Sequence, residues 1–272
     1  IFASHEQVES IIQNPKIVGV SLTGSEKAGR IIAKLAGQHL KKVVLELGGS
    51  DPFIVFEDSN IDLAVKTAVR ARFTNAGQVC ISAKRFLIQE SIFKIFQEKF
   101  LNEVSTLKIG NPQNKDTNLG PLARKDIMET IHKQVEESLN LGAKKLYANV
   151  QIPEKGWFYP PTILTHVKKG MPVYDNETFG PVAVLIPFKD CDEAIQLAND
   201  TQYGLGASIW TQDNDIANRC SNQIQAGAVF INAQVTSMPE LPFGGIKSSG
   251  FGRELGLEGL TTFCNIKTIY QG

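Results

Sequence analysis

The sequence predicts an α/β fold in which a mainly parallel sheet carries helices on both faces. Short apolar runs with strand composition alternate with longer amphipathic runs along most of the 272 residues. This alternation is typical of Rossmann-like domains, because parallel strands must be joined by a crossover, usually a helix. The hydrophobic content of 42% is enough for a sizeable buried core. We therefore expect a globular chain built around a Rossmann-like parallel sheet.

The first elements follow one another without long loops. The run at 17–22 reads as a strand and 26–40 as an amphipathic helix, with the turn 23–25 between them. A second strand at 42–47 stops at two glycines, Gly48 and Gly49. We expect this first portion to continue a sheet that is already under way.

A second series of elements begins after Gly49. The run at 52–57 again has strand composition, and further strand-like and helix-like runs alternate after it. The expected elements are helix 60–74, strand 85–89, helix 91–104, helix 124–141, strand 227–232 and strand 265–270. The last strand has an exposed edge that could pair with another chain.

These runs predict three portions. Residues 1–49 are expected to be the remnant of a cofactor-binding domain, and 50–250 a larger Rossmann-like domain. Residues 251–272 are expected to be a terminal segment with a strand of the kind that joins subunits.

Composition excludes several classes of partner. Lys and Arg number 28 and Asp and Glu number 28, so no net charge attracts nucleic acid. No apolar run approaches the roughly 20 residues of a membrane helix. The four cysteines are far apart and lack zinc-ligand spacing, so neither a metal nor a disulfide framework is expected, and a reducing, cytoplasmic setting fits best. The four histidines lie outside every motif, which leaves a Cys-His dyad without local support.

Cys80 is the cysteine with a chemical context. It follows a predicted helix end in the pattern N-x-G-x-x-C, formed by Asn75, Gly77 and Cys80. A glycine-containing loop can present a thiol and its own backbone N–H toward one space, which suits attack on a carbonyl and stabilisation of the resulting oxyanion. Cys80 is therefore the candidate nucleophile, with an inert buried thiol as the alternative.

Glu46 is the candidate base. It stands at the end of a strand otherwise made of valine and leucine, where a carboxylate is costly unless it is paired, hydrated or protonated. Burial there would raise its pKa toward neutrality, which suits a general base. The alternative is a strand-end glutamate facing solvent.

The turn 23–25 is a candidate anion site. Gly24 and Ser25 link a strand to a helix, whose free N–H groups and dipole favour a phosphate. Most such turns are plain connections, so this signal is weak alone.

Four segments in order carry a resemblance to a known family. They are ELGGSDP at the second strand, GQVCISAKR around Cys80, and later ETFGP and PFGGIKSSGFGRELG. Together they resemble the aldehyde dehydrogenase superfamily from about Val18 to the end of the chain, and specifically its carboxy-terminal half. The resemblance implies that the cofactor-binding strands precede Ile1, so that this chain alone has little activity.

The resemblance assigns roles to particular positions. It implies that Cys80 is the nucleophile, that Glu46 activates the hydrolytic water, and that NAD or NADP accepts a hydride. Gly24 and Ser25 then become contacts of the cofactor. Leu47 and Gly48 resemble positions that pack against its nicotinamide. In ETFGP, Glu177 and Phe179 are similar to the family's clamp on the nicotinamide ribose.

The substrate follows from a finer resemblance. The segments around Cys80 and near the chain end look most like bacterial succinate-semialdehyde dehydrogenases that use NAD or NADP. Some of these enzymes place an arginine immediately before the asparagine of the nucleophile loop to hold the distal carboxylate. That position is Thr74 here, and Arg72 and Arg85 lie nearby in sequence as candidates for the same role, with no motif that assigns it to them. Another small aliphatic aldehyde is the alternative substrate.

The resemblance also implies a homo-oligomer of the full-length protein, joined through strand pairing. A different class of function remains open: a folded, non-catalytic fragment. Thiol reactivity distinguishes the two, because an activated Cys80 should be alkylated faster than the other three cysteines.

Overall fold

The structure, a computed structural model, describes residues 3–146 and 150–272 and divides into two units. One unit contains the chain up to Gly48 together with Ser237–Gly272, and the other is Gly49–Thr236. The chain thus passes from the first unit to the second where the two glycines follow the second strand. Residues 237–250 differ from the expectation, which placed them with the larger domain: they belong to the first unit.

The first unit is built on a three-stranded sheet of order β1-β2-β12. Its elements are α1 (His5–Gln13), β1 (Gly19–Thr23), α2 (Glu26–Gln38), β2 (Lys42–Glu46), β11 (Ile246–Lys247), β12 (Gly250–Phe251) and α9 (Gly256–Thr261). β1 pairs parallel with β2, and β12 pairs antiparallel with it, Gly250 opposite Glu46. Gly250 has φ +113°, and a Cβ there would lie 1.9 Å from the Leu45 carbonyl oxygen. This close pairing is why the segment after 237 joins the first unit.

The second unit holds the remaining elements. Its strands are β3 (Pro52–Val55), β4 (Arg85–Gln89), β5 (Lys144–Leu146), β6 (Thr162–Thr165), β7 (Val182–Phe188), β8 (Tyr203–Gly204), β9 (Gly206–Trp210) and β10 (Ala228–Ile231). Its helices are α3 (Ile61–Phe73), η1 (Thr74–Gly77), η2 (Glu90–Ile92), α4 (Phe93–Ser105), α5 (Lys125–Asn140), α6 (Pro172–Asp175), α7 (Cys191–Asn199) and α8 (Asn214–Gln223).

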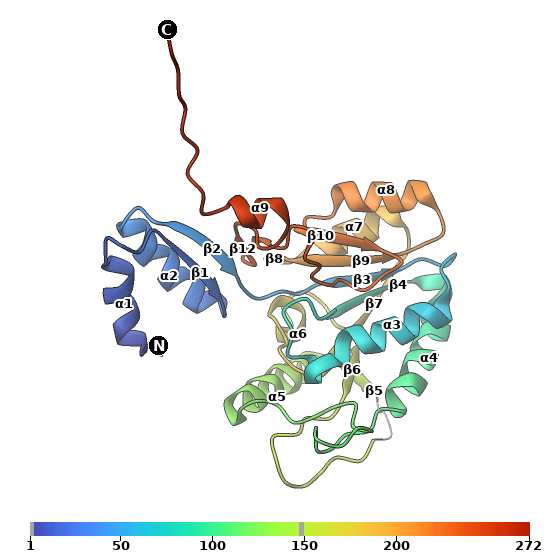
Figure 1. The fold of residues 1–272 in the computed structure, drawn as a ribbon. Helices are drawn as coiled ribbons and strands as arrows, with labels where there is room; N and C mark the ends of the chain where they lie inside the picture. Colours follow the sequence, from blue (N-terminus) through green and yellow to red (C-terminus); the bar gives the residue numbers. More distant parts are fainter. Residues whose placement is uncertain (1–2, 147–149) are drawn as a thin grey trace. The chain divides into compact units, whose positions relative to one another are not determined.

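Seven of the described strands form one sheet of order β10-β9-β3-β4-β7-β6-β5. All neighbours pair parallel except β5 with β6. α7 and α8 lie on one face and α3 and α4 on the other (Figure 1). Because both faces are covered, the central strands are largely apolar and buried, as the four buried residues of β3 show. The predicted α/β class with helices on both faces is confirmed.

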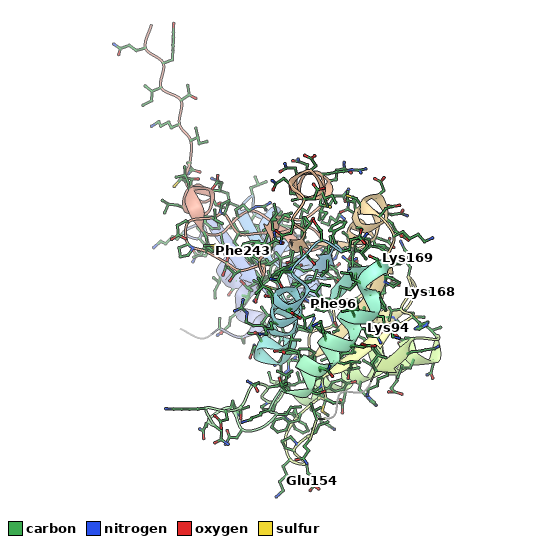
Figure 2. All side chains as sticks on the ribbon, turned by 90° about the vertical axis from the view of Figure 1, so that its right-hand side faces the viewer. Lys94, Phe96, Glu154, Lys168, Lys169 and Phe243 are labelled. Carbon is green, nitrogen blue, oxygen red and sulfur yellow. The ribbon has the colours of Figure 1, made fainter. Side chains whose placement is uncertain are left out.

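α4 shows how helix periodicity places residues on this sheet. Phe96, Phe100 and Val104 recur every four residues and are fully buried, whereas Lys94 on the same helix is exposed (Figure 2). The ring of Phe100 lies 5.3 Å from that of Phe86 on β4, measured between centroids. The helix thereby fixes the position of β4, the strand that follows the Cys80 loop.

The expectation of a strand at 265–270 is wrong for the chain by itself. After α9 the chain runs on as an extended segment without helix or strand (Figure 1). Ile266, Ile269 and Tyr270 are 101%, 84% and 89% exposed. A strand requires a hydrogen-bonded neighbour, and this segment has none within the described part of its own chain.

Across residues 3–146 and 150–272, no helix is both long and apolar enough to cross a membrane. Within the same ranges, three or more His, Cys, Asp or Glu side chains nowhere gather where a metal ion could be held.

Candidate functional site

The Cys80 loop of the second unit begins with a sharp reversal at the end of α3. Asn75, Ala76 and Gly77 have φ angles of 51°, 54° and 73°, so three successive residues are left-handed. This conformation is unfavourable for residues with a Cβ and marks a site where the surrounding structure imposes it. At Gly77 a Cβ would lie 2.4 Å from the carbonyl oxygen of Gly180. The glycine of N-x-G-x-x-C is therefore required by packing against the ETFGP segment.

The buried side chain of Arg72 stabilises this reversal of the chain. Its side chain is fully buried, and its guanidinium donates to the carbonyl oxygens of Ala83 at 3.1 Å, Gly77 at 2.8 Å, Thr178 at 3.3 Å and Gly180 at 2.6 Å. Burial lowers the pKa of Arg72 to about 9. One side chain thus ties the residues on both sides of Cys80 to the ETFGP segment.

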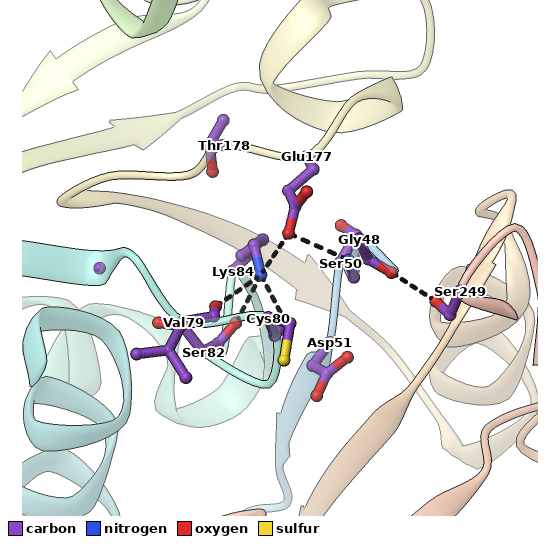
Figure 3. A network of polar contacts seen from close by, with 12 residues as sticks. Gly48, Ser50, Asp51, Val79, Cys80, Ser82, Lys84, Glu177, Thr178 and Ser249 are labelled. Carbon is purple, nitrogen blue, oxygen red and sulfur yellow. Dashed lines mark hydrogen bonds and ion pairs between the residues drawn. The ribbon is translucent and has the colours of Figure 1, made fainter. Parts of the chain in front are cut away.

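Lys84 forms a second tie between the same two segments (Figure 3). Its buried ammonium donates to the carbonyl oxygens of Cys80 at 2.9 Å, Ser82 at 3.1 Å and Val79 at 3.5 Å. It also lies 3.7 Å from a carboxylate oxygen of Glu177. A buried ammonium needs such partners, and here they are the backbone of the nucleophile loop and the carboxylate expected to hold the ribose.

The surroundings of Cys80 disfavour ionisation of its thiol. Burial raises the pKa of Cys80, and the charge of Lys84 and the N–H of Ile81 only partly oppose this. The carboxylates of Asp51 and Glu177 act in the same direction as burial. The thiolate consequently forms at a higher pH than for an ordinary cysteine, and Lys84 is the largest influence that favours it.

Asp51 is a buried carboxyl group close to the nucleophile loop. Its Oδ1 accepts from the N–H of Gly206 at 3.0 Å, while its Oδ2 has no hydrogen-bond partner in the described part of the chain. Burial raises the pKa of Asp51 to about 7, opposed chiefly by the charge of Lys84. The site thus contains a carboxyl group that gains or loses a proton near neutrality.

Glu46 lies in the first unit, at the end of β2. Its neighbours across the sheet are Thr23 on β1 and Gly250 on β12, so strands flank it on both sides. Its side chain is 2% exposed, and neither carboxylate oxygen has a hydrogen-bond partner among the described residues. Burial raises the pKa of Glu46 to about 7, with Glu254 adding to the rise and Arg253 opposing it. The expected rise in pKa is confirmed, and the solvent-facing alternative is wrong.

The turn before α2 has the features of a phosphate site, although the N–H of Gly24 is already used in another hydrogen bond. Ser25 is the N-cap residue, and its hydroxyl oxygen accepts from the N–H of Ala28 at 3.3 Å. The N–H of Gly24 already donates to the carbonyl oxygen of Glu46 at 2.9 Å. The donors left for a pyrophosphate are therefore the Ser25 hydroxyl and the first free N–H groups of the helix.

Leu47 and Gly48 are both held in place within the first unit. A Cβ on Gly29 would lie 2.5 Å from a methyl carbon of Leu47, so the Leu47 side chain packs directly on α2. The carbonyl oxygen of Gly48 accepts from the Ser249 hydroxyl at 2.7 Å. The backbone here is fixed, which suits a surface against which a flat ring is placed.

Glu177 and Phe179 lie half-buried in the second unit, after α6. One carboxylate oxygen of Glu177 accepts from the N–H of Gly49 at 3.1 Å and faces Lys84. The other makes no hydrogen bond within the described chain, and a free carboxylate oxygen is a suitable acceptor for ribose hydroxyls. The residues thus fit the nicotinamide half of a dinucleotide. Cys80 and Glu177 are brought together through Lys84, which sequence reasoning did not single out.

The arginines considered as anchors for a substrate carboxylate are not available. Arg72 is fully buried, and both of its terminal nitrogens donate to backbone carbonyl oxygens, while its Nε has no partner among the described residues. Arg85 is also fully buried and donates to the carbonyl oxygens of Ser50, Leu197 and Ala198. Both arginines hold the backbone together, so the suggestion that either replaces the missing arginine at Thr74 is wrong.

The sequence offered one signal that could have identified Lys84 and Arg85. Lys84 stands immediately before the strand RFLIQ and Arg85 is its first residue, where burial is expected and a charge requires a partner.

The other three cysteines lie in two different settings. The sulfurs of Cys191 and Cys220 lie 3.6 Å apart, and Cys264 is exposed.

Comparison with known proteins places the whole chain in one family. Residues 2–269 match the profile of the aldehyde dehydrogenase family. The chain is 46% identical over 272 residues to a protein of Mycobacterium ulcerans named succinate-semialdehyde dehydrogenase [NADP(+)] 1. A protein of the same name from Mycobacterium tuberculosis is 45% identical over 270 residues. The match covers 100% of this chain and 59% of the M. ulcerans protein, so the chain spans well under two thirds of that relative's length.

Solved structures agree. Succinic semialdehyde dehydrogenase from Streptococcus pyogenes, determined with NADP+, superposes with a TM-score of 0.96 at 41% identity, covering 100% of this chain and 60% of that one. Betaine aldehyde dehydrogenase from Staphylococcus aureus, determined with NAD+, superposes with a TM-score of 0.89 at 34% identity, covering 94% and 52%.

Proposed function

The chain belongs to the aldehyde dehydrogenase family, and on that premise we propose that its protein oxidises an aldehyde to a carboxylic acid with NAD or NADP as the hydride acceptor. We propose succinate semialdehyde as the substrate. The M. ulcerans, M. tuberculosis and S. pyogenes proteins named above support this choice, since each carries that substrate in its name. A small aliphatic aldehyde without a carboxylate is the alternative substrate.

The observation that carries the proposal is the double tie between the Cys80 loop and the ETFGP segment. Arg72 and the Lys84–Glu177 pair hold a nucleophile and a ribose-binding carboxylate in one rigid arrangement. A plain structural cysteine has no need of such support. An enzyme that must pass a hydride from a substrate on the sulfur to a cofactor does need it, because both partners have to be positioned together.

In the first half of the reaction Cys80 acts as the nucleophile. Its thiol releases its proton to water, the thiolate attacks the aldehyde carbon, and the developing alkoxide is stabilised by backbone N–H groups of the loop, including that of Cys80. Glu177 would hold the ribose of a bound dinucleotide through its free carboxylate oxygen, and the nicotinamide would supply the hydride acceptor. Once the substrate carbon has lost its hydride, a thioester remains on Cys80.

In the second half Glu46 acts as the general base. It removes a proton from a water molecule, which attacks the thioester, and the carboxylic acid leaves as the Cys80 thiol is restored. A buried carboxyl group with a pKa raised to about 7 is strong enough as a base for this step and is still ionised in part at neutrality.

We propose further that the full protein is a cytoplasmic homo-oligomer. The exposed apolar residues of the segment after α9 supply a surface that another chain could cover. All four cysteines are free, which fits a reducing compartment.

The test is a turnover assay with succinate semialdehyde and either NAD or NADP, following reduced cofactor, with the Cys80→Ala variant as control. We expect turnover that depends on Cys80 and shows which cofactor is preferred. Equal formation of reduced cofactor by the unmodified protein and the Cys80→Ala variant, or none by either, would favour the non-catalytic alternative.

A further inference from the structure

A groove of about 530 Å³ lies within the second unit, along α3. One wall is a stripe of that helix carrying Leu63, Thr67, Arg70 and Thr74, whose spacing of four, three and four residues keeps them on one face. The other wall is the segment 232–236 that follows β10. At 1.5 Å per residue the stripe is about 16 Å long, and it ends where η1 begins the nucleophile loop.

Arg70 presents a free cationic end to this groove. Its Nε donates to the side-chain oxygen of Gln234 across the groove at 2.9 Å. Its two terminal nitrogens make no hydrogen bond in the described residues, and no carboxylate of those residues lies within ion-pair distance of the guanidinium. A guanidinium fixed through Nε, with both terminal nitrogens open, is arranged to bind a carboxylate through two parallel hydrogen bonds.

Thr74 does not compete with Arg70 for this role. Its hydroxyl donates to the Arg70 carbonyl oxygen at 2.7 Å, so its proton is already committed to ending α3. A threonine used in this way offers an anion nothing but lone pairs. The positive charge on this wall of the groove comes from Arg70 alone among the lining residues.

The helical wall leads to Cys80. The hydroxyl of Ser82 donates to the carbonyl oxygens of Ala71 at 2.8 Å and Arg72 at 3.1 Å. The loop residue two positions beyond Cys80 is therefore fastened to the last turn of α3, the turn that carries Arg70. Two residues of chain span at most about 7 Å, so the nucleophile stays close to this turn.

The opposite wall, the segment 232–236, is also linked to the Cys80 loop by a series of contacts. Val235 packs on Gly206, where a Cβ would lie 2.8 Å from a Val235 methyl group. The N–H of Gly206 donates to Asp51. A Cβ on Gly49 would lie 3.3 Å from Asp51 and 2.6 Å from the Cys80 carbonyl oxygen. The two walls of the groove thus converge on the nucleophile loop from different parts of the chain.

We infer that this groove binds the substrate and that Arg70 selects aldehydes carrying a distal carboxylate, that is, short ω-oxo acids. The inference rests on the proposed function, because it assigns specificity to the same reaction at Cys80. Arg72 and Arg85 are fully buried with their terminal nitrogens on backbone carbonyl oxygens, whereas Arg70 is exposed and both of its terminal nitrogens are open. Gln234 acts as the positioning residue that keeps the guanidinium across the groove.

The test uses protection of Cys80 and needs no cofactor. Cys80 is alkylated with iodoacetamide at increasing concentrations of succinate semialdehyde or butanal, a four-carbon aldehyde without the carboxylate, and its modification is measured by peptide mass spectrometry. We expect succinate semialdehyde to protect at lower concentration than butanal. In Arg70→Met the half-protecting concentration of succinate semialdehyde should rise about 10- to 100-fold, and that of butanal by less than about 2-fold.

Two further variants separate recognition from simpler effects. Arg70→Lys keeps the charge at the helix end but loses the planar fork, and should restore protection only in part. Lys66→Met removes a cation from an exposed position of the same helix outside the groove and should change nothing. The unfolding midpoint of each variant verifies that the fold is kept.

Each outcome supports or overturns the role of Arg70. Equal effects of Arg70→Met on both aldehydes, or no effect on either, would overturn the role of Arg70 and leave the proposed function standing. If neither aldehyde protected Cys80 in the unmodified protein, the proposed function would fail, and the inference with it.

Discussion

Glu46 and Asp51 are two buried carboxyl groups whose pKa values burial raises to about 7, yet they differ in their partners. Asp51 accepts a backbone hydrogen bond from Gly206 and faces the charge of Lys84. Glu46 has no hydrogen-bond partner among the described residues. Both carboxylate oxygens of Glu46 lack a hydrogen-bond partner, whereas Asp51 lacks one only at Oδ2. This difference is consistent with Glu46 as the proposed base and with Asp51 as a residue that supports the loop.

Glu46→Gln should separate the two halves of the reaction. Glutamine cannot remove a proton from water, so we expect one equivalent of reduced cofactor per site in a rapid burst, followed by slow turnover. In the unmodified protein the steady-state rate should rise with pH through about 7, because Glu46 acts only when ionised. Rapid-mixing kinetics between pH 6 and 8 measure both. A variant that kept full steady-state turnover would exclude Glu46 as the base.

Asp51→Asn should change the pH dependence of stability. The folded pKa of Asp51 is about 7 and its ordinary value 3.8, so between these values the folded state binds more protons than the unfolded state, and stability falls as pH rises. Asparagine keeps the acceptor for Gly206 but cannot ionise. We expect the variant to match the unmodified protein at pH 4 and to exceed its unfolding free energy by roughly 1 to 4 kcal/mol above pH 7. Urea unfolding at several pH values measures this difference, and a constant difference would contradict it.

Lys84→Met should make the Cys80 thiol harder to ionise. The charge of Lys84 lowers the pKa of Cys80 against the effect of burial, so its removal should move the midpoint of the alkylation rate to higher pH. The measurement is the rate of iodoacetamide modification of Cys80 between pH 7 and 10, with Lys66→Met as the matched control. An unchanged midpoint would mean that the Lys84 charge does not reach the sulfur.

At the scale of elements, the decisive unit is the join between α3, η1 and the ETFGP segment. The left-handed residues 75–77 reverse the chain, and Arg72 satisfies four carbonyl oxygens that the reversal leaves buried. The nucleophile loop is therefore held by side-chain hydrogen bonds although little of it has regular structure. A loop held in this way lets a reactive residue lie outside secondary structure and still be placed accurately.

Arg72→Met should destabilise this join strongly. It leaves four buried carbonyl oxygens short of a donor, and we expect a loss of about 3 kcal/mol or more in the free energy of unfolding. Lys66→Met, on the exposed side of the same helix, should stay within about 0.5 kcal/mol of the unmodified protein. Chemical denaturation measures both. A small loss in Arg72→Met would mean that water replaces the guanidinium.

At the scale of the whole molecule, the segment after α9 has apolar side chains that no other described part of the chain covers. Deleting residues 265–272 should leave the unfolding free energy of the separated subunit nearly unchanged, because Ile266, Ile269 and Tyr270 are exposed. If the segment joins subunits, the same deletion should lower the mass in solution measured by light scattering. An unchanged oligomeric mass would place the subunit interface elsewhere.

The local sequence determined the order and kind of most elements and the position of the nucleophile. β4 (Arg85–Gln89) was expected at those residues, and α5 within one residue at each end. Strand composition and helical periodicity are properties of neighbouring residues, so they can be read without knowing the fold. The same holds for Glu46, since a lone carboxylate in an apolar strand signals burial wherever the strand is placed. The strand at 265–270 failed because its partner is not in the local sequence.

Tertiary structure alone decided which charges support the site and which one remains free. Three arginines, Arg70, Arg72 and Arg85, stand within 16 residues and look alike in the sequence. Packing buries two of them against backbone carbonyl oxygens and leaves Arg70 open to a groove. Several of these carbonyl oxygens come from residues more than 100 positions away, such as Gly180 and Ala198. A hydrogen bond over such a separation depends on how strands and helices pack, which local patterns do not encode.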